Sequence, residues 1–241
     1  MIKKSIFGKI TLVVVGALII PTFAVAQIKM GIILGFTGPI ESLTPDMGKS
    51  AELAFKEVSD SGQLLGGQKV SVVRADSTCI DAAAATAAAE RLITSDKVAG
   101  IMGADCSGVT TAIANNVAVP NGVAMISPSA TSPALSTIAD NGYFFRTAPS
   151  DARQGQVLAE ITIERGINNV AVTYINNDYG KGLSDSFINS YKGLGGKVSA
   201  VVPHEADKAD FSAEVATLDA SGADVLAVFG YVDQGGNHII Q

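Results

Sequence analysis

The sequence predicts an α/β fold in which two lobes, each a doubly wound parallel sheet, follow one another along the chain. From residue 27 onward, short runs of β-branched apolar residues alternate with longer segments whose apolar residues recur at helical spacing. The short runs are apolar on both faces, which is typical of parallel strands covered by helices on both sides. The alternation is interrupted at residues 147–150, around Pro149, and then restarts. We therefore expect one lobe over residues 27–147 and a second over 148–241.

Each lobe is expected to join its strands through helices by right-handed crossovers. In the first lobe, β-branched runs predict strands over 28–34, 70–73, 98–102, 123–126 and 144–146. Helical spacing there predicts helices over 46–59, 82–94 and 107–117, and Asp81 is placed to cap the second of them. In the second lobe, the same patterns predict helices over 152–164, 179–191 and 211–220, and strands over 170–174, 197–202 and 225–229.

The first 26 residues have the pattern of a signal peptide for secretion. Lys3, Lys4 and Lys9 precede an apolar run over 10–20, and Pro21 and an Ala-Val-Ala sequence at 24–26 follow it. The run is too short to span a bilayer comfortably, so cleavage is expected before Gln27; an N-terminal membrane anchor is the alternative. Because no cysteine lies near this position, the protein is not expected to be a lipoprotein. The mature protein is then expected in the periplasm, without stable insertion into the membrane.

Removal of residues 1–26 leaves a strongly acidic chain. The whole sequence has 17 basic and 23 acidic residues, and the removed segment holds three lysines and no acid. The mature protein therefore has 14 basic against 23 acidic residues, a net charge of −9. Such a charge argues against nucleic acid or anionic lipid as partners. We expect the mature protein to be a monomer.

Cys79 and Cys106 are the only cysteines in the sequence. In an oxidising compartment an even pair predicts a disulfide, which stabilises a fold by roughly 3–4 kcal/mol through the loop that it closes. Two buried free thiols are the alternative. His204 and His238 are the only histidines, and neither has zinc-ligand spacing with the cysteines. We therefore expect no metal site and no cofactor.

The strand-end loops are the places where a ligand is expected, because ligands of open parallel sheets bind beyond the carboxyl ends of the strands. These loops are rich in Gly, Ser and Thr and poor in charge, and they cover 35–39, 103–108, 127–131, 176–182 and 230–236. Ser107 is placed at a helix N-terminus, where free N–H groups and the helix dipole favour a carboxylate. Thr131 offers a second hydroxyl, and the Ser129 carbonyl can accept from an ammonium group. Ordinary helix capping is the alternative for Ser107.

Two tyrosines follow strand ends of the second lobe. Tyr179 and Tyr231 can each cover a ligand with an apolar ring and a polar tip, although ordinary half-buried tyrosines give the same pattern. The sequence has no G-x-G-x-x-G, P-loop or G-x-S-x-G motif. Asp76, Asp105 and Asp178 are single loop carboxylates, which we expect to cap helices or to be solvated. No enzymatic activity is expected.

Several short motifs occur in an order that resembles a known family. They are Thr37-Gly38-Pro39, Ala75-Asp76 with Cys79, Cys106-Ser107, ISPSATSP at 126–133, Phe145-Arg146-Thr147, Asp178-Tyr179-Gly180-Lys181-Gly182 and KADFS at 208–212. Each motif is short, but together and in this order they are specific. Over residues 28–241 the chain resembles the leucine/isoleucine/valine-binding proteins of bacterial importers, which are type I periplasmic binding proteins.

The resemblance implies a fold whose two lobes close on the ligand about a hinge. It also implies a disulfide between Cys79 and Cys106. The ligand-binding residues that it implies are Ser107 for the carboxylate, Ser129, Ala130 and Thr131 for the carboxylate and the ammonium, and Tyr179 and Tyr231 as walls of the side-chain pocket.

The chain departs from the family in two respects. The family has a ligand-facing tyrosine near the start of its first helix, whereas here the segment 41–46 is longer and Met47 is the nearest large side chain. The family's acidic partner for the ammonium, and a further crossing between the lobes, lie beyond residue 241. We therefore expect the chain to be incomplete at its C-terminus.

The expected function is that of an extracytoplasmic solute-binding protein. It would capture an amino acid, branched-chain or similar, between its lobes and deliver it to the membrane permease of an ABC transporter. The alternative is the ligand-binding sensor domain of a receptor or regulator with the same fold, which a following transmembrane helix or signalling domain would indicate. An enzyme is a third class, and the absent motifs argue against it.

Overall fold

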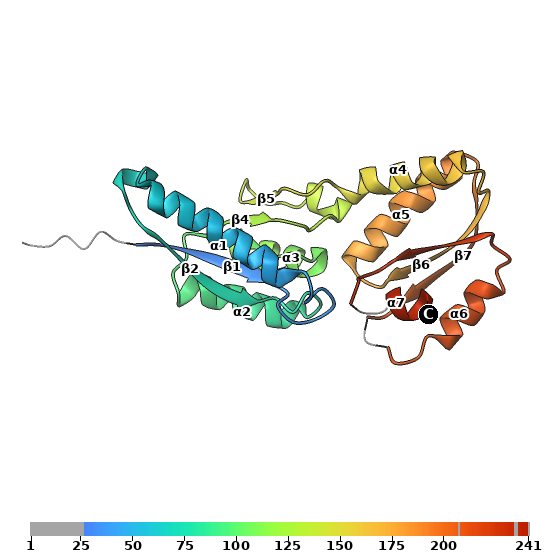
Figure 1. Cartoon of the computed structure of the whole chain (residues 1–241), viewed down its shortest axis with the longest axis horizontal. Helices are drawn as coiled ribbons and strands as arrows, with labels where there is room; N and C mark the ends of the chain where they lie inside the picture. Colours follow the sequence, from blue (N-terminus) through green and yellow to red (C-terminus); the bar gives the residue numbers. More distant parts are fainter. Residues whose placement is uncertain (1–26, 207, 234–235, 241) are drawn as a thin grey trace, which may run out of the picture.

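The computed structural model describes residues 27–206, 208–233 and 236–240, and Figure 1 shows them as two α/β units side by side. One unit is built on a five-stranded sheet and the other on a three-stranded sheet, and the paired strands in both are parallel. We call these units the first lobe and the second lobe. The chain passes from one to the other at residues 147–150. The predicted signal peptide, residues 1–26, lies outside the described residues.

The first lobe has the strand order β2-β1-β3-β4-β5, so the order reverses between β1 and β3. Its strands are β1 (Ile28–Leu34), β2 (Val70–Asp76), β3 (Gly100–Gly103), β4 (Ala124–Ser127) and β5 (Phe144–Arg146). Helix α1 (Thr44–Ser61) covers one side of the sheet, and α2 (Ala82–Thr94) and α3 (Ser107–Ile113), which contact each other, cover the other side (Figure 1). The switch point between β1 and β3 is where such a fold binds a ligand.

The start of α2 agrees with the sequence prediction, whereas the end of α3 differs from it. Asp81 caps α2 as predicted, because its carboxylate accepts from the backbone N–H groups of Ala83 and Ala84, both at 2.9 Å. The helix predicted over 107–117 is continuous only in part. The α-helical pattern ends at Ile113, and Ala114–Ala118 continue as a wider turn in which Val119 N–H donates to the Ala114 carbonyl at 3.0 Å.

The second lobe has the strand order β7-β6-β8. Its elements are α4 (Asp151–Glu164), β6 (Asn169–Ile175), α5 (Asp178–Gly193), β7 (Lys197–His204), α6 (Ser212–Asp219), β8 (Val225–Phe229) and the short α7 (Gly236–Ile240), which the sequence pattern did not predict. Helices α4 and α5 pack closely because Gly155 has no side chain. A Cβ at that position would lie 2.6 Å from the Phe187 backbone nitrogen.

Each lobe buries its own apolar core. In the first lobe, Ile33, Ile101 and Met125 from three neighbouring strands are buried with Leu92 of α2. In the second lobe, Val172 of β6 is buried with Leu183 and Phe187 of α5. Among the residues that the structure describes, no helix is both long enough and apolar enough to cross a membrane.

The predicted disulfide joins Cys79 to Cys106. The two Cα atoms are 5.2 Å apart, and both residues are 3% exposed. Since both cysteines are bonded, the alternative of two free thiols is wrong. The bond ties the loop after β2 to the residue before α3, beside the switch point of the sheet.

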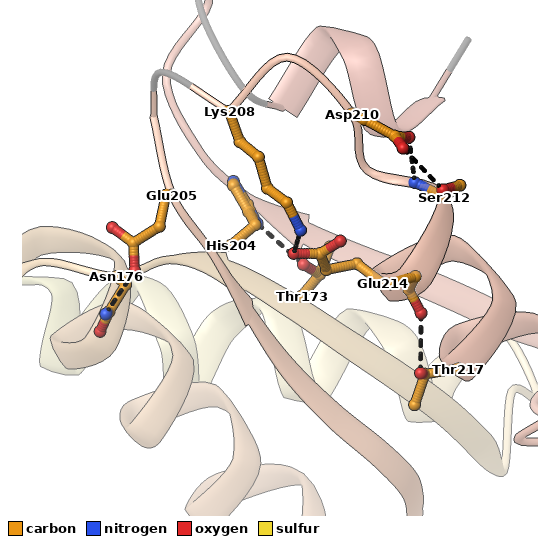
Figure 2. A network of polar contacts seen from close by, with 10 residues as sticks. Thr173, Asn176, His204, Glu205, Lys208, Asp210, Ser212, Glu214 and Thr217 are labelled. Carbon is orange, nitrogen blue, oxygen red and sulfur yellow. Dashed lines mark hydrogen bonds and ion pairs between the residues drawn. The ribbon is translucent and has the colours of Figure 1, made fainter.

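A polar cluster lies near the carboxyl ends of β6 and β7 in the second lobe, and Figure 2 shows His204 there beside Thr173. His204, at the end of β7, is 1% exposed, and its Nδ1 lies 2.8 Å from the Thr173 hydroxyl. Its Nε2 is buried and makes no hydrogen bond within the described residues. Burial lowers the pKa of His204, and the charges of Glu214 and Glu205 only partly oppose this effect. The imidazole is therefore held neutral as part of the core.

Loss of the disulfide should destabilise the protein. The two cysteines are 27 residues apart, and opening a loop of that length costs roughly 3–4 kcal/mol on the chain-entropy estimate. For a chain of this size we expect the melting temperature to fall by roughly 6–16 °C. The measurement is a thermal melt with and without reductant. The control is the Cys79→Ala/Cys106→Ala variant. Its melting temperature should already be lowered and should not change when reductant is added. A wild-type melt that reductant leaves unchanged would contradict a stabilising role.

His204 should make the protein less stable as the pH falls. The unfolded chain takes up a proton near pH 6.5, whereas the buried imidazole has a lower pKa and resists it, so the unfolded state gains protons first. We expect the melting temperature of the wild type to fall between pH 7.5 and about 5.5 by more than that of His204→Gln, whose amide can still pair with Thr173. Parallel curves for the two proteins would show that His204 does not carry this dependence.

Candidate ligand-binding site

A cavity of about 280 Å³ lies between the two lobes, at the switch point of the first sheet. Its size is at the small end of ligand pockets, which span about 300–1,000 Å³. The first lobe contributes strand-end loops and the start of α1, and the second lobe contributes α4, α5 and the loop after β8. The lining residues are Ile40, Leu43, Met47, Asp105, Cys106, Ser107, Ser129, Thr131, Gln154, Tyr179, Gly230, Tyr231 and Val232.

Asp105 joins the loops that form the first-lobe side of the cavity. Its carboxylate accepts from Gly35 N–H at 2.7 Å, from the Ser77 hydroxyl at 3.2 Å and from Cys106 N–H at 3.0 Å. The expectation that Asp105 is a capping or solvated carboxylate is therefore wrong, since it is only 2% exposed. Burial raises the pKa of Asp105, and these hydrogen bonds oppose the rise. The carboxylate thus fixes three strand-end loops relative to one another.

Ser107 begins α3, as predicted, but it does not act as a helix cap. The capping position belongs to Cys106, and the Ser107 hydroxyl oxygen accepts from the backbone N–H groups of Thr131 at 3.2 Å and Ser132 at 3.1 Å. A serine oxygen has two acceptor positions and one proton to donate. Both acceptor positions are occupied by the protein, so the remaining proton is available for an acceptor in the cavity that Ser107 lines.

The backbone of residues 130–132 is already hydrogen-bonded within the protein. Ala130 N–H donates to the Ser127 hydroxyl, and the Ala130 and Ser132 carbonyls accept from Arg146. The Thr131 carbonyl accepts from Asp151 N–H at 2.9 Å. The groups of this loop left for a ligand are the Thr131 side chain and the Ser129 carbonyl.

Five of the six predicted ligand-binding residues line this one cavity. They are Ser107, Ser129, Thr131, Tyr179 and Tyr231. Ala130 is fully buried and lies behind the cavity wall, where its backbone holds the loop in place. The structure therefore brings five of the predicted residues to one cavity and places Ala130 behind them.

One wall of the cavity is apolar and aromatic. Tyr179, which lies in the first turn of α5, stacks on Tyr231 with ring centroids 5.2 Å apart and an angle of 18° between the rings. Asn177 donates to the Tyr231 hydroxyl at 3.4 Å, and burial raises the pKa of both tyrosines. Opposite them, the first lobe presents Met47 with Ile40 and Leu43. The tyrosines therefore remain neutral, and the wall suits an apolar group.

Asp151 is a feature that the sequence did not reveal. It is the first residue of α4 and is fully buried, yet neither carboxylate oxygen makes a hydrogen bond within the described residues. Burial raises the pKa of Asp151, whereas the approaching Thr131 side chain, which does not reach hydrogen-bond geometry, and the charge of Arg146 lower it. The carboxylate also raises the pKa of Tyr179 and Tyr231, which places it within electrostatic reach of the cavity.

A larger opening of about 730 Å³ lies between the lobes on the side of Cys79. Several of its charged and polar side chains already have protein partners: Asn176 donates to Glu205 at 2.8 Å, and Lys208 pairs with Glu214 at 2.5 Å. Within the part of the chain that the structure describes, no three His, Cys, Asp or Glu side chains are grouped to hold a metal ion. The smaller cavity, next to an unpartnered buried carboxylate, is therefore the better candidate for a ligand.

Comparison with known proteins agrees with this arrangement. A family model described as periplasmic binding protein matches residues 27–240. The Leu/Ile/Val-binding protein homolog 3 of Brucella melitensis is 33% identical over 217 residues, which are 88% of this chain and 57% of that protein. The chain thus spans little more than half the length of this relative.

Solved structures give the same fold. The substrate-binding protein LivJ from Streptococcus pneumoniae, in complex with isoleucine, has a TM-score of 0.73 and 30% identity, covering 84% of this chain and 57% of that chain. A solute-binding protein from R. palustris in complex with benzoate has a TM-score of 0.76 at 22% identity, covering 89% of this chain and 58% of that chain. The second likeness shows the fold alone. The match over residues 27–240 establishes that this chain belongs to the periplasmic binding protein family.

Proposed function

We propose that this protein is the extracytoplasmic solute-binding component of an ABC importer and that it captures an amino acid between its two lobes. The observation that carries this proposal is the Asp151 carboxylate, which is fully buried beside the cavity without a hydrogen-bond partner. A buried charge without a partner is costly, so such a group calls for a cation from outside the protein. The ammonium group of an amino acid is a cation of suitable size.

The ammonium site is completed by Thr131 and Ser129. Thr131 lines the cavity and approaches Asp151, and the Ser129 carbonyl makes no hydrogen bond within the described residues. Both oxygens can accept N–H bonds. An ammonium group in the cavity would have these two oxygens as acceptors, and the buried charge of Asp151 behind Thr131 would favour it electrostatically.

The carboxylate of the amino acid is proposed to bind at Ser107. The Ser107 hydroxyl has both acceptor positions occupied by Thr131 and Ser132 N–H groups, which leaves its proton to donate. No lysine or arginine lines the described cavity wall, so the ligand carboxylate is held by neutral donors. A neutral carboxylate site beside a negative ammonium site selects a zwitterion over a simple acid.

The side chain of the ligand is proposed to be aliphatic and branched. The remaining wall is formed by Met47, Ile40 and Leu43 of the first lobe and by the stacked pair Tyr179 and Tyr231. These side chains offer apolar surface, which favours a Leu, Ile or Val side chain over a charged one. The LivJ structure with isoleucine and the Leu/Ile/Val-binding relative support the same class.

Delivery to a membrane permease, a periplasmic location after removal of residues 1–26, and a monomeric state are parts of the same proposal. The delivery and the periplasmic location are supported by the predicted signal peptide and by the names of the relatives, of which this chain spans 57%. The sensor alternative uses the same fold and the same cavity. LivJ is named as a substrate-binding protein of a branched-chain amino acid transporter, so the transport role is the one proposed.

The proposed ligand is tested by comparing leucine with isocaproate, which is leucine without its amino group, by isothermal titration. We expect the wild type to prefer leucine by about 30-fold or more, since the ammonium binds a charged partner. Asp151→Asn should narrow this preference to a few-fold, while its melting temperature stays equal or rises because a buried unpaired charge is removed. Asp178→Asn is the matched control, because Asp178 also begins a helix but is exposed. Equal binding of leucine and isocaproate to the wild type, or tight binding of benzoate alone, would overturn the proposal.

The hydroxyl groups of Ser107 and Thr131 are tested separately. Thr131→Val keeps the shape and removes the hydroxyl, and should weaken leucine binding by about 1–3 kcal/mol, whereas Thr131→Ser should bind nearly as the wild type does.

Ser107→Ala should weaken leucine binding by at least as much and should also lower the melting temperature, because Thr131 and Ser132 lose their N–H acceptor. Thr111→Ala is the control, since it removes a hydroxyl of α3 that bonds to the Ser107 carbonyl outside the cavity lining. Unchanged affinity in Ser107→Ala and Thr131→Val would exclude this cavity as the site.

A further inference from the structure

Ser42 and Asp233 connect the two lobes by hydrogen bonds. Ser42 lies in the loop before α1 of the first lobe, and Asp233 lies in the loop after β8 of the second lobe. The Asp233 carboxylate accepts from Ser42 N–H at 3.0 Å and from the Ser42 hydroxyl at 2.9 Å. Asp233 N–H in turn donates to the Pro39 carbonyl at 3.2 Å. Three hydrogen bonds thus join segments that are 191 residues apart in the sequence.

A second contact between the lobes is of a different kind. Gly182 of α5 packs against the first lobe so closely that a Cβ there would lie 2.7 Å from Pro133 Cδ and 3.2 Å from the Ser132 hydroxyl. Arg146, at the end of β5, binds this same region through the Ser132 carbonyl and the Ser136 hydroxyl. The chain crosses between the lobes directly after Arg146. This side is therefore tightly packed and covalently connected, as a pivot requires.

The cavity lies between these two contacts. Its lining includes Ser129 and Thr131 next to the packed side, and Ile40, Leu43 and Val232 next to the hydrogen-bonded side. Parting of the lobes at Ser42 and Asp233 would move the wall formed by Ile40 and Leu43 away from Tyr231. It would therefore open the cavity to water without disturbing the pivot.

We propose that Ser42 and Asp233 form a clasp that holds the two lobes closed over the cavity and so controls the release of the ligand. For the identity of the ligand this inference rests on the proposed function, whereas the clasp itself does not depend on it. Both side chains are exposed. When the lobes part, water can replace each protein partner, so the clasp adds a modest free energy and remains reversible.

The clasp predicts a pattern that a contact with the ligand would not give. If only the closed arrangement binds tightly, the apparent dissociation constant equals the intrinsic one divided by the closed fraction. Loss of the clasp lowers the closed fraction. The affinity for every ligand should then fall by the same factor, and the preference among ligands should not change. A residue that touches the ligand side chain would instead change the preference.

The experiment measures lobe separation and binding in the same variants. Fluorophores at positions 57 of α1 and 164 of α4, both exposed, report the separation by energy transfer without any ligand. Asp233→Asn and Ser42→Ala should each shift the population toward greater separation. Both should weaken the binding of leucine, isoleucine and valine by the same factor, about three- to tenfold, mainly through faster dissociation. Asp233→Ala removes both acceptor oxygens, so adding Ser42→Ala to it should weaken binding no further, because the two residues act through one contact.

Matched controls remove charge without touching the clasp. Glu41→Gln changes the neighbouring residue of the same loop, and Asp219→Asn removes an exposed carboxylate of the second lobe; neither should alter separation or affinity. Unchanged lobe separation in both clasp variants, at wild-type melting temperature, would overturn the clasp whether or not amino acids bind. A wild type that binds no amino acid, but whose lobes part in Asp233→Asn, would support the clasp and overturn only the proposed ligand.

Discussion

The first-lobe half of the binding site depends on one buried carboxylate, Asp105. Its side chain accepts from the loops after β1 and β2 and from the residue that precedes α3, and its carbonyl accepts from the Ser129 hydroxyl after β4 at 3.0 Å. Four strand-end loops therefore converge on one residue. The geometry of these loops is therefore fixed in part by hydrogen bonds that are sheltered from water. The disulfide from Cys79 to Cys106 acts at the same place and limits the same loops covalently.

Asp105 and Asp151 show how one residue type acquires opposite roles. Burial raises the pKa of both, but Asp105 is surrounded by three donors from its own protein, whereas neither oxygen of Asp151 has one within the described residues. The first carboxylate is thereby a structural anchor whose charge is stabilised by hydrogen bonds within the protein. The second carboxylate has no hydrogen-bond donor within the described residues. Its neighbour Thr131 lies between it and the cavity, which Thr131 lines. The structural role of Asp105 and the proposed ligand-binding role of Asp151 therefore differ because of hydrogen bonding and not because of burial.

The sequence predicted those features that depend on local pattern. The strands β1, β5 and β8 and the helix α2 have the predicted bounds, because β-branched runs and the Asp81 cap act over a few residues. Ser107 was placed at a helix start for the same reason. The partners of its hydroxyl, Thr131 and Ser132, could not be predicted, because they depend on how two loops meet after folding. Asp151 lies just before the helix predicted over 152–164, so no pattern singled it out, and its burial arises only from the packing around α4.

The contact of Gly182 with Pro133 and the contact of Asp233 with Ser42 differ in a way that favours movement on the Asp233 side. Close packing of Gly182 on Pro133 leaves no room for water, so separating these groups would open an empty space and lose dispersion contacts. The hydrogen bonds of Asp233 to Ser42 are exposed, and water can replace them at small cost. A hinge needs this asymmetry, because a ligand can shift the balance between two states only by its difference in affinity for them. If both sides were packed as the pivot is, the binding energy of a single amino acid would have to break a buried interface before the ligand could leave.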